Sequence, residues 1–582
     1  MSKLLILFAI LCGLIYVSPN IYYVLNTTHY NPLSINNNIN NIDSTLYVSG
    51  ISEEVQGNIL PSDLAVYEHK KDYVSLYNPV PFMITGALSY CIGGVYNLLI
   101  ISSFIFAIIY FIIFYYLTFF FIRDEKLCII CSIILLFFYR LFIVPPLSSV
   151  NTIYDYYMHI IFNTGPSPAY LWFSQIVHPQ ASLLFFLLAI LFLLHGIEWN
   201  KIYLFAITGI MFSILFYSYF YYWTYFIVIL CISIGWFYLK KNYLVVKGIL
   251  ISLLVGVISG VPFFYGVYHS ASKIISRSGI EYGRYLEIIT IPLIMVYLVM
   301  YLLLTKENKK ELTLFSLLYL PILLVMNIQL LTGYTIQNNH YMSRCMVPIL
   351  IVISFVLLSK YIVKLKHHNI MKNIILFSLI ILAINIQISD ILKLSRYVSF
   401  QDSEYELINW LNANTTRETV ILTTSLKLNM YIPAYTFDNV YFPYSATTLS
   451  TQDELEERFI LTYKLFNYSS GYVSDRLLSN SIYKRNNPNS IKQVNTSIDF
   501  FLTGYIFADG VYIIERGIFK RYGYNLTKVN NLIYKYNNTD FDTYNLLKYR
   551  VDYIILVNNE TILWNNTKEV YANKNYTVVQ VI

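Results

Sequence analysis

Long apolar runs separated by short basic connectors dominate the first two thirds of this 582-residue chain. A bilayer core about 30 Å thick takes about 20 apolar helical residues to cross, and runs of that length recur until about residue 392. The sequence therefore predicts a polytopic α-helical membrane domain at 1–392 and an extracytoplasmic domain at 393–582. The predicted spans, about eleven in number, are 4–25, 95–122, 127–146, 180–197, 202–222, 224–239, 249–268, 288–305, 312–332, 345–363 and 373–392.

Two independent signals orient these spans. Lys and Arg gather in alternate connectors, which the positive-inside rule places in the cytoplasm. Nine N-x-S/T sequons, the acceptor tripeptides of N-glycosylation, all fall on the opposite side. We therefore expect a cytoplasmic N-terminus, a first outer loop at 26–94 and residues 393–582 outside. The net charge of +7 comes largely from the basic connectors, so it indicates topology and not nucleic-acid binding.

The first outer loop carries an ordered set of acidic and turn residues. Apolar residues recur every four positions from Tyr47 to Val55, which predicts a helix over 44–56 lying on the membrane surface. Asp43 stands at its start. Glu54 falls on the same face but about 16 Å away along the helix axis, which is too far for a glycosidase-like carboxylate pair. One carboxylate must therefore act alone or with a metal.

Four residue patterns follow one another in this loop. They are Asp43-Ser-Thr-Leu-Tyr47, the acidic helix end Glu53-Glu54, Gly57-x-x-Leu-Pro61, and Tyr77-x-Pro-x-Pro81 leading to Gly94. Together they resemble the first outer loop of GT-C membrane glycosyltransferases, in particular the group of aminoarabinose transferases and protein O-mannosyltransferases. Ser44 stands where that group has a second acid. Oligosaccharyltransferases share the general layout, but their Trp-Trp-Asp signature is missing from this sequence, which disfavours en bloc oligosaccharide transfer.

The resemblance implies transfer of a sugar from a polyprenyl (dolichyl) phosphate donor to an acceptor at the outer membrane face, with Asp43 as general base. A carboxylate in a partly dry groove has a raised pKa and can take the acceptor's proton. The leaving lipid phosphate then needs Arg, Lys or a divalent metal such as Mg²⁺ or Mn²⁺. Helix N-capping is the alternative role for Asp43, and Ser44 keeps an inactive GT-C-like surface protein as an alternative for the chain.

Three arginines on the predicted outer side are candidates for the donor phosphate: Arg344, Arg277 and Arg284. An Arg at the outer start of a span suits bidentate contact with a lipid phosphate. The same position equally suits snorkelling of Arg344 to the interface, and the other two are spaced to pair with nearby glutamates on a short helix.

The sequence offers four candidates for the acceptor or sugar pocket: Glu54, Tyr77, Asp155 and His340. Asp155 and His159 are four residues apart, a spacing that supplies two metal ligands on a helix. The sequence shows no third ligand, so the metal requirement stays open. For His340 the alternative is a structural histidine, and Glu53 and Glu54 are also explained as solvated charges at the helix end.

From residue 403 onward the pattern changes to that of a soluble α/β domain. Helical periodicity at 404–410 precedes a strand-like run at 419–423, and a second strand at 551–557 is followed by a closing strand at 575–582. No catalytic triad, phosphate loop or metal motif is evident there. The chief alternative function is a transporter or lipid flippase with an outer partner-binding domain, but the sequence shows no internal repeat.

The expected partners are the bilayer, a polyprenyl-phosphate-linked sugar and an unidentified glycan, lipid or protein acceptor. The Asn-, Ile- and Tyr-rich composition with dense sequons suggests an archaeal plasma membrane, and an endoplasmic reticulum protein would also fit.

Overall fold

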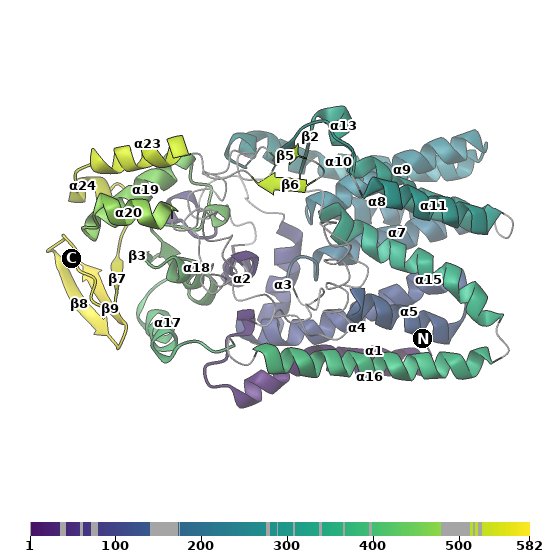
Figure 1. Ribbon diagram of the computed structural model, residues 1–582, viewed down its shortest axis with the longest axis horizontal. Helices are drawn as coiled ribbons and strands as arrows, with labels where there is room; N and C mark the ends of the chain where they lie inside the picture. The colour runs from purple at the N-terminus through teal and green to yellow at the C-terminus, as the bar shows by residue number, and fades with distance from the viewer. Residues whose placement is uncertain are drawn as a thin grey trace. The chain divides into compact units, whose positions relative to one another are not determined.

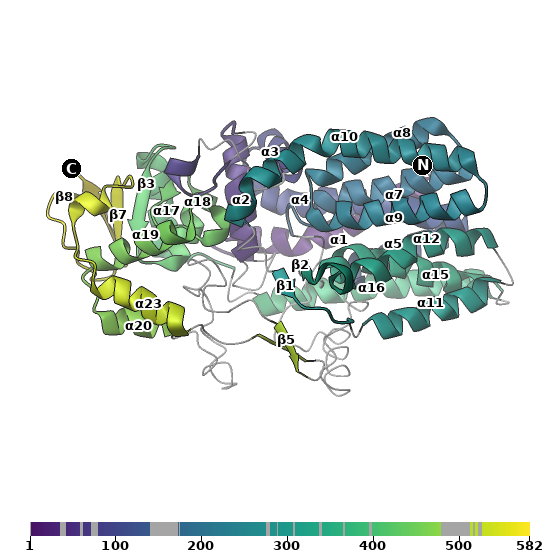
Figure 2. The same cartoon turned by 90° about the horizontal axis from the view of Figure 1, so that it is seen from above.

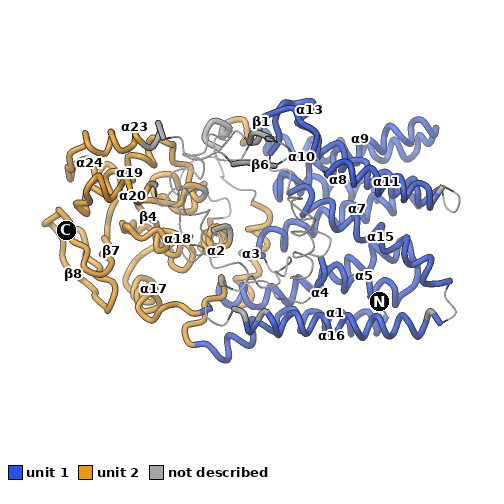
Figure 3. Tube along the Cα trace, viewed as in Figure 1, with its two compact units in different colours: residues 1–27, 96–265, 283–398 blue, residues 28–95, 266–282, 399–582 orange. Residues whose placement is uncertain are grey.

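The computed structural model describes most of the chain and divides it into two compact units (Figure 3). Unit 1 comprises residues 1–27, 96–265 and 283–398, and unit 2 comprises 28–95, 266–282 and 399–582. The described residues are 2–34, 42–58, 62–70, 79–139, 173, 175–274, 280–287, 289–305, 309–336, 340–364, 367–394, 398–478, 512–515, 518–521 and 526–582.

Unit 1 is made of apolar helices. Among the residues that the structure describes, eight helical stretches are long and apolar enough to cross a membrane, and Ile202–Phe216 and Thr290–Leu304 are shorter apolar helices. The polytopic α-helical prediction is confirmed. In chain order (Figure 1) the helices are α1 (Lys3–Asn26), α4 (Val95–Ile122), α5 (Glu125–Phe137), α7 (Ser182–Trp199), α8 (Ile202–Phe216), α9 (Phe220–Leu239), α10 (Tyr243–Ile274), α11 (Thr290–Thr305), α12 (Lys309–Val325), α13 (Gln329–Thr332), the π-helical turn η6 (Tyr341–Met346), α15 (Val347–Val363) and α16 (His368–Leu394).

Ion pairs join the helix ends that the sequence assigns to the cytoplasmic side. Lys310, at the start of α12, lies 3.1 Å from Glu198 at the end of α7. Lys360 near the end of α15 pairs with Glu311 at 2.5 Å, and Lys372 on α16 pairs with the α5 N-cap Asp124 at 2.6 Å. In Figures 1 and 2 the long helices of unit 1 run along roughly one direction. The basic connectors that contain these residues therefore lie together at one end of the unit 1 helices.

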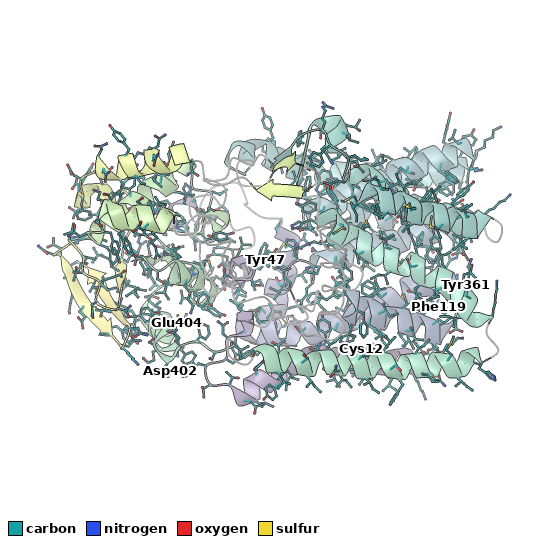
Figure 4. The ribbon with its side chains drawn as sticks, viewed as in Figure 1. Cys12, Tyr47, Phe119, Tyr361, Asp402 and Glu404 are labelled. Carbon is teal, nitrogen blue, oxygen red and sulfur yellow. The ribbon has the colours of Figure 1, made fainter. Side chains whose placement is uncertain are left out.

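Aromatic rings accompany the basic residues at the same helix ends. Arg123 lies over the Phe119 ring at 5.5 Å, and Lys364 lies over the Tyr361 ring at 5.7 Å. Figure 4 shows Phe119 and Tyr361 toward the same end of the helices. A cation above an aromatic ring at the end of an apolar helix is typical of a membrane interface.

Unit 2 contains a five-stranded mixed sheet in the order β4-β3-β7-β9-β8. β3 runs parallel to β4 and β7, and β9 is antiparallel to β7 and β8. The predicted α/β domain is confirmed. The strands are β3 (Val420–Thr423), β4 (Asn439–Val440), β5 (Tyr512–Glu515), β6 (Ile518–Arg521), β7 (Tyr553–Val557), β8 (Thr567–Ala572) and β9 (Tyr576–Val581), and the short strands β1 (Ile280–Tyr282) and β2 (Tyr334–Ile336) lie earlier in the chain.

Helices of unit 2 come from both the first outer loop and the C-terminal residues. α17 begins at Asp402, and Figure 4 labels this residue and Glu404 on it. Its buried Leu407 and Leu411 join Ile421 of β3 in the domain core. The unit 2 helices are α2 (Ile42–Val55), α3 (Pro79–Cys91), α17 (Asp402–Asn414), α18 (Leu426–Tyr435), α19 (Gln452–Leu465), α20 (Ser470–Leu478), α23 (Leu526–Asn537) and α24 (Thr543–Leu546), with short turns η1 (Pro32–Ser34), η2 (Tyr67–His69) and η7 (Ser445–Thr447).

The first outer loop is part of the α/β domain by packing. Ala65 belongs to its buried core, and the Ala65 carbonyl accepts a hydrogen bond from the Val440 amide at 2.9 Å. Asp63, fully buried, accepts from the amides of Ala65 and Val66. Its other oxygen accepts from the Leu449 amide at 2.6 Å and the Thr448 hydroxyl at 2.7 Å. These bonds satisfy a carboxyl that would otherwise be costly to bury.

A buried guanidinium makes the second connection between this loop and the α/β domain. Arg458 of α19 has no exposed side-chain surface and lies 2.9 Å from both Glu454 and the loop residue Glu68. It also donates to the Tyr441 carbonyl at 3.0 Å and lies 3.8 Å from the centre of the Tyr549 ring. Because Arg stays charged at all accessible pH, its burial depends on a carboxylate from the loop as well as one from its own helix.

We predict that Arg458→Met destabilises unit 2, because the substitution leaves two carboxylates in a buried site without their cation. Breaking a buried ion pair costs about 3–5 kcal/mol. Chemical unfolding of the purified protein, followed by intrinsic fluorescence, measures the change. The matched control is Lys548→Met, which removes a 57% exposed Lys paired with Glu457 and should cost no more than about 1 kcal/mol. Equal stability of the two variants would contradict the role given to Arg458.

Candidate functional site

Helix α2, which carries the acidic motif of the first outer loop, lies against α3 and α18 of unit 2. Its side chains from Ser44 to Glu53 are buried. The packing is close enough that a Cβ on Gly50 would lie 2.3 Å from the Phe82 ring of α3. The predicted helix is confirmed, but these side chains are enclosed rather than lying on a membrane surface. Its small polar residues make this possible, since Ser49 and Ser52 donate to the carbonyls of Thr45 and Ala434.

Asp43 is the second residue of α2, which begins at Ile42. Its backbone is helical, so it occupies the first turn of the helix instead of the N-cap position. A carboxylate in the first turn is favoured by the helix dipole. The Asp43 side chain lies outside the described residues. Because Glu54 belongs to the same helix, the separation of about 16 Å along the axis still applies.

The two acids at the other end of α2 differ in environment. Glu53 is 4% exposed, accepts from Asn58 and pairs with Lys70 at 2.5 Å. Glu54 is half-buried against Gly86 of α3, where an added Cβ would lie 2.7 Å from the Glu54 Cβ. Burial raises the pKa of Glu54 to about 8, and its buried Oε1 has no hydrogen-bond partner among the described residues. Neither acid is the solvated helix-end charge that the sequence alone suggested.

Asp438, which sequence reasoning missed, adds a further acid near this helix end. It is buried between α18 and β4, with the hydroxyls of Thr415 and Thr436 at its carboxyl group. Burial raises its pKa to about 7, an effect that the positive charge of Lys70 partly opposes. The C-terminal end of α2 is thus surrounded by polar groups of the α/β domain, and Arg417 also donates to the Gln56 carbonyl at 3.0 Å.

Unit 1 holds a second candidate site, around Arg344. This residue is 6% exposed and lies in the π-helical turn η6, which leads directly into α15. Its guanidinium carbon lies 5.0 Å from the centre of the Tyr219 ring. π-Helical turns are rare and are frequent at functional sites. An Arg held in this way presents a permanent positive charge at the beginning of an apolar span.

Two histidines accompany Arg344. The Tyr219 hydroxyl lies 2.7 Å from His340 Nδ1, and the His178 ring lies 4.4 Å from the Tyr219 ring. His340 also stacks on Tyr221 at 4.8 Å. Burial, reinforced by the charge of Arg344, lowers the pKa of His340 to about 3 and that of His178 well below its usual value. Both imidazoles are therefore neutral at physiological pH, and the guanidinium provides the positive charge of this group of four.

The remaining predicted residues fall elsewhere. Arg284 is exposed and donates to the carbonyls of Leu330 and Leu331 at 2.6 and 3.1 Å, at the C-terminal end of α13. Arg277, Tyr77 and Asp155 lie outside the described residues. Within the described part of the chain, no three His, Cys, Asp or Glu side chains gather so that they could hold a metal ion.

The structure brings together Arg344 and His340, which the sequence proposed for different roles. It adds Tyr219 to them as a residue that sequence reasoning missed. The only available signal was a Tyr just before an apolar run. That signal is weak here, because the chain has 57 tyrosines.

Comparison with solved structures finds chains that resemble this one. The chain is similar to the crystal structure of an oligosaccharyltransferase from Archaeoglobus fulgidus tethered to an acceptor peptide that contains the NVT sequon. The two are 10% identical, and the alignment covers 96% of this chain and 69% of that one with a TM-score of 0.44. No family model and no curated protein matches this chain. A likeness this remote carries no argument about the reaction or about any residue.

We predict that Glu54 makes unit 2 less stable as the pH rises. Its pKa is about 8 in the folded protein against an ordinary value of 4.5, so unfolding releases a proton between these values and stability falls with rising pH across that window. In Glu54→Gln this contribution is absent, and the fall in Tm from pH 5 to pH 8 should be smaller than in the wild type. Glu53→Gln is the matched control. It should lower Tm by removing the pair with Lys70. An unchanged slope in Glu54→Gln would contradict the prediction.

Proposed function

We propose that this protein is a membrane glycosyltransferase that moves a sugar from a polyprenyl-phosphate donor to an acceptor at the outer membrane face. The observation that carries the proposal is the buried Arg344 at the beginning of an apolar span, held against Tyr219 beside two neutral histidines. A lipid phosphate lies at the depth where a membrane span begins, and Arg is well suited to bind it. The acceptor class in this proposal is a hydroxyl of a glycan, lipid or protein.

In the reaction that we propose, one bond forms at the anomeric carbon and one bond breaks. The acceptor oxygen attacks the anomeric carbon of the sugar, and a general base takes the acceptor's proton, the role that the family resemblance implies for Asp43. The bond between the anomeric carbon and the phosphate oxygen breaks, and the electron pair leaves with the lipid phosphate. The donor phosphodiester has one negative charge and the released lipid phosphate has two, so the charge at the phosphate grows as the bond breaks. Arg344 stabilises the added charge.

The packing of α2 supports a role for Asp43. A general base must be held within hydrogen-bond reach of the proton that it takes, and α2 is held by close contacts with α3 and by the Glu53–Lys70 pair. The second acid of the resembling family is Ser44 here, and it is buried at 2% exposure. The described residues do not form a ligand set for Mg²⁺ or Mn²⁺, and no step in this mechanism is assigned to a metal.

We expect Asp43→Asn to lose sugar transfer by at least about 100-fold, since general-base catalysis contributes about 10²–10⁴-fold. The assay follows radiolabelled sugar from dolichyl-phosphate donors in membranes that contain equal amounts of each variant. Asp402→Asn is the matched control, because Asp402 is 86% exposed. Full activity of Asp43→Asn would exclude it as the base. If the wild type consumes no polyprenyl-phosphate sugar, the transporter alternative is favoured.

We expect Arg344→Gln to raise the KM for the donor and to lower kcat, because the charge of Arg344 acts on the bound phosphate and on the leaving group. Arg344→Lys should restore part of kcat through its charge but lack the planar, bidentate guanidinium. Arg123→Gln, at the opposite end of the spans and 54% exposed, is the matched control with unchanged kinetics. A normal donor KM and kcat in Arg344→Gln would remove Arg344 from the site.

A further inference from the structure

Tyr219 is in contact with every other member of the group around Arg344. Its ring faces the Arg344 guanidinium at 5.0 Å and the His178 ring at 4.4 Å, and its hydroxyl lies 2.7 Å from His340 Nδ1. Tyr219 precedes the first residue of α9 and has an extended backbone, with φ −163° and ψ 127°. The backbone conformation of the turn before α9 therefore orients the Tyr219 ring.

The partners of Tyr219 belong to different spans. His178 precedes α7, while His340 and Arg344 belong to the turn that leads into α15. Tyr219 itself stands at the start of α9. One side chain thus joins the N-terminal ends of three apolar helices, all of which the sequence assigns to the outer side.

The ring and the hydroxyl of Tyr219 contact different residues. The ring offers its negative face to the guanidinium, and such a contact is worth about 0.5–2 kcal/mol. The contact also limits the rotamers of Arg344, whose long side chain loses much conformational entropy when it is held in one place. The hydroxyl bonds to His340, and a neutral imidazole that accepts this bond at Nδ1 carries its hydrogen on Nε2. His340 then offers an N–H donor at Nε2, and its imidazole lies near enough to Arg344 for the guanidinium charge to lower the pKa of His340.

We propose that Tyr219 is a positioning residue that holds Arg344 and His340 as one anion-binding unit for the phosphate of the polyprenyl-linked donor. The ring orients the guanidinium of Arg344. The hydroxyl orients the imidazole of His340 so that its N–H is available to a second phosphate oxygen. This inference rests on the proposed function, because it takes the donor phosphate as the ligand of Arg344. It adds His340 to the phosphate site.

The test uses the full-length protein in lipid nanodiscs with dolichyl phosphate as the probe and dolichol, which lacks the phosphate, as the reference. Tyr219→Leu should weaken binding of dolichyl phosphate about tenfold, within the range for a lost cation–π contact, and leave dolichol binding unchanged. Tyr217→Leu is the matched control, since Tyr217 is in the same turn and donates to the Ser259 carbonyl.

A double-mutant cycle separates positioning from a merely structural role. If the ring of Tyr219 acts through Arg344, Tyr219→Leu should weaken binding of dolichyl phosphate about tenfold in the wild type but only about threefold in the Arg344→Gln background, where only the bond to His340 is left to lose. Fully additive losses, or wild-type affinity in Tyr219→Leu, would overturn the inference while the donor site itself stands. No preference of the wild type for dolichyl phosphate over dolichol would overturn the proposed function and this inference together.

The hydroxyl provides a second test that holds if Tyr219→Leu does not fold. Tyr219→Phe keeps the ring and loses the bond to His340, and we expect about threefold weaker binding of dolichyl phosphate, in the range for one hydrogen bond. His340→Ala should cause a loss at least as large, and the two substitutions together should equal His340→Ala alone. Wild-type binding by Tyr219→Phe, or additive losses, would contradict the role of the hydroxyl.

Discussion

The burial of Arg458 constrains unit 2 more than any other interaction. A guanidinium cannot shed its proton, so it can be buried only where carboxylates and carbonyls surround it. Glu454 comes from its own helix, but Glu68 comes from the first outer loop. The α/β domain therefore includes a segment that precedes it by more than three hundred residues, since Arg458 and Glu68 are 390 positions apart. Asp63, with its four hydrogen bonds, holds the same segment in place.

This arrangement has a consequence for the chemistry that we propose. The helix that carries Asp43 is packed against α18 of the C-terminal domain, and its far end is surrounded by Glu53, Lys70 and Asp438. The domain is therefore a structural support for the acidic motif. In unit 1 the arrangement is different. There a permanently charged Arg344 lies among aromatic rings and neutral imidazoles, and we propose the donor phosphate as its ligand.

Much of the fold could be predicted because its signals are local. Span lengths, basic connectors and the four-residue repeat of α2 depend on neighbouring residues, and the helices and strands lie close to the predicted ranges. The run from Tyr77 to Gly94 was predicted as a lead into the second span, whereas residues 79–91 form the separate helix α3. Pro79 is the first residue of α3, and Pro is favourable at that position of a helix. This local signal was overlooked because the run was interpreted from the family pattern. The prediction that α2 lies on the membrane surface was wrong, because the hydrophobic repeat of this helix is equally compatible with burial on several sides.

Hydrophobic length and periodicity act over single elements, so the amino-acid sequence alone predicts a polytopic helical protein with a C-terminal α/β domain. It also placed Asp43 and Glu54 on one helix, too far apart to act as a pair. Folding leaves Glu54 half-buried with a raised pKa while Glu53 is paired, and it brings Arg344, His340, His178 and Tyr219 together. These contacts join residues far apart in the chain, and burial and charge pairing depend on what each side chain meets after folding.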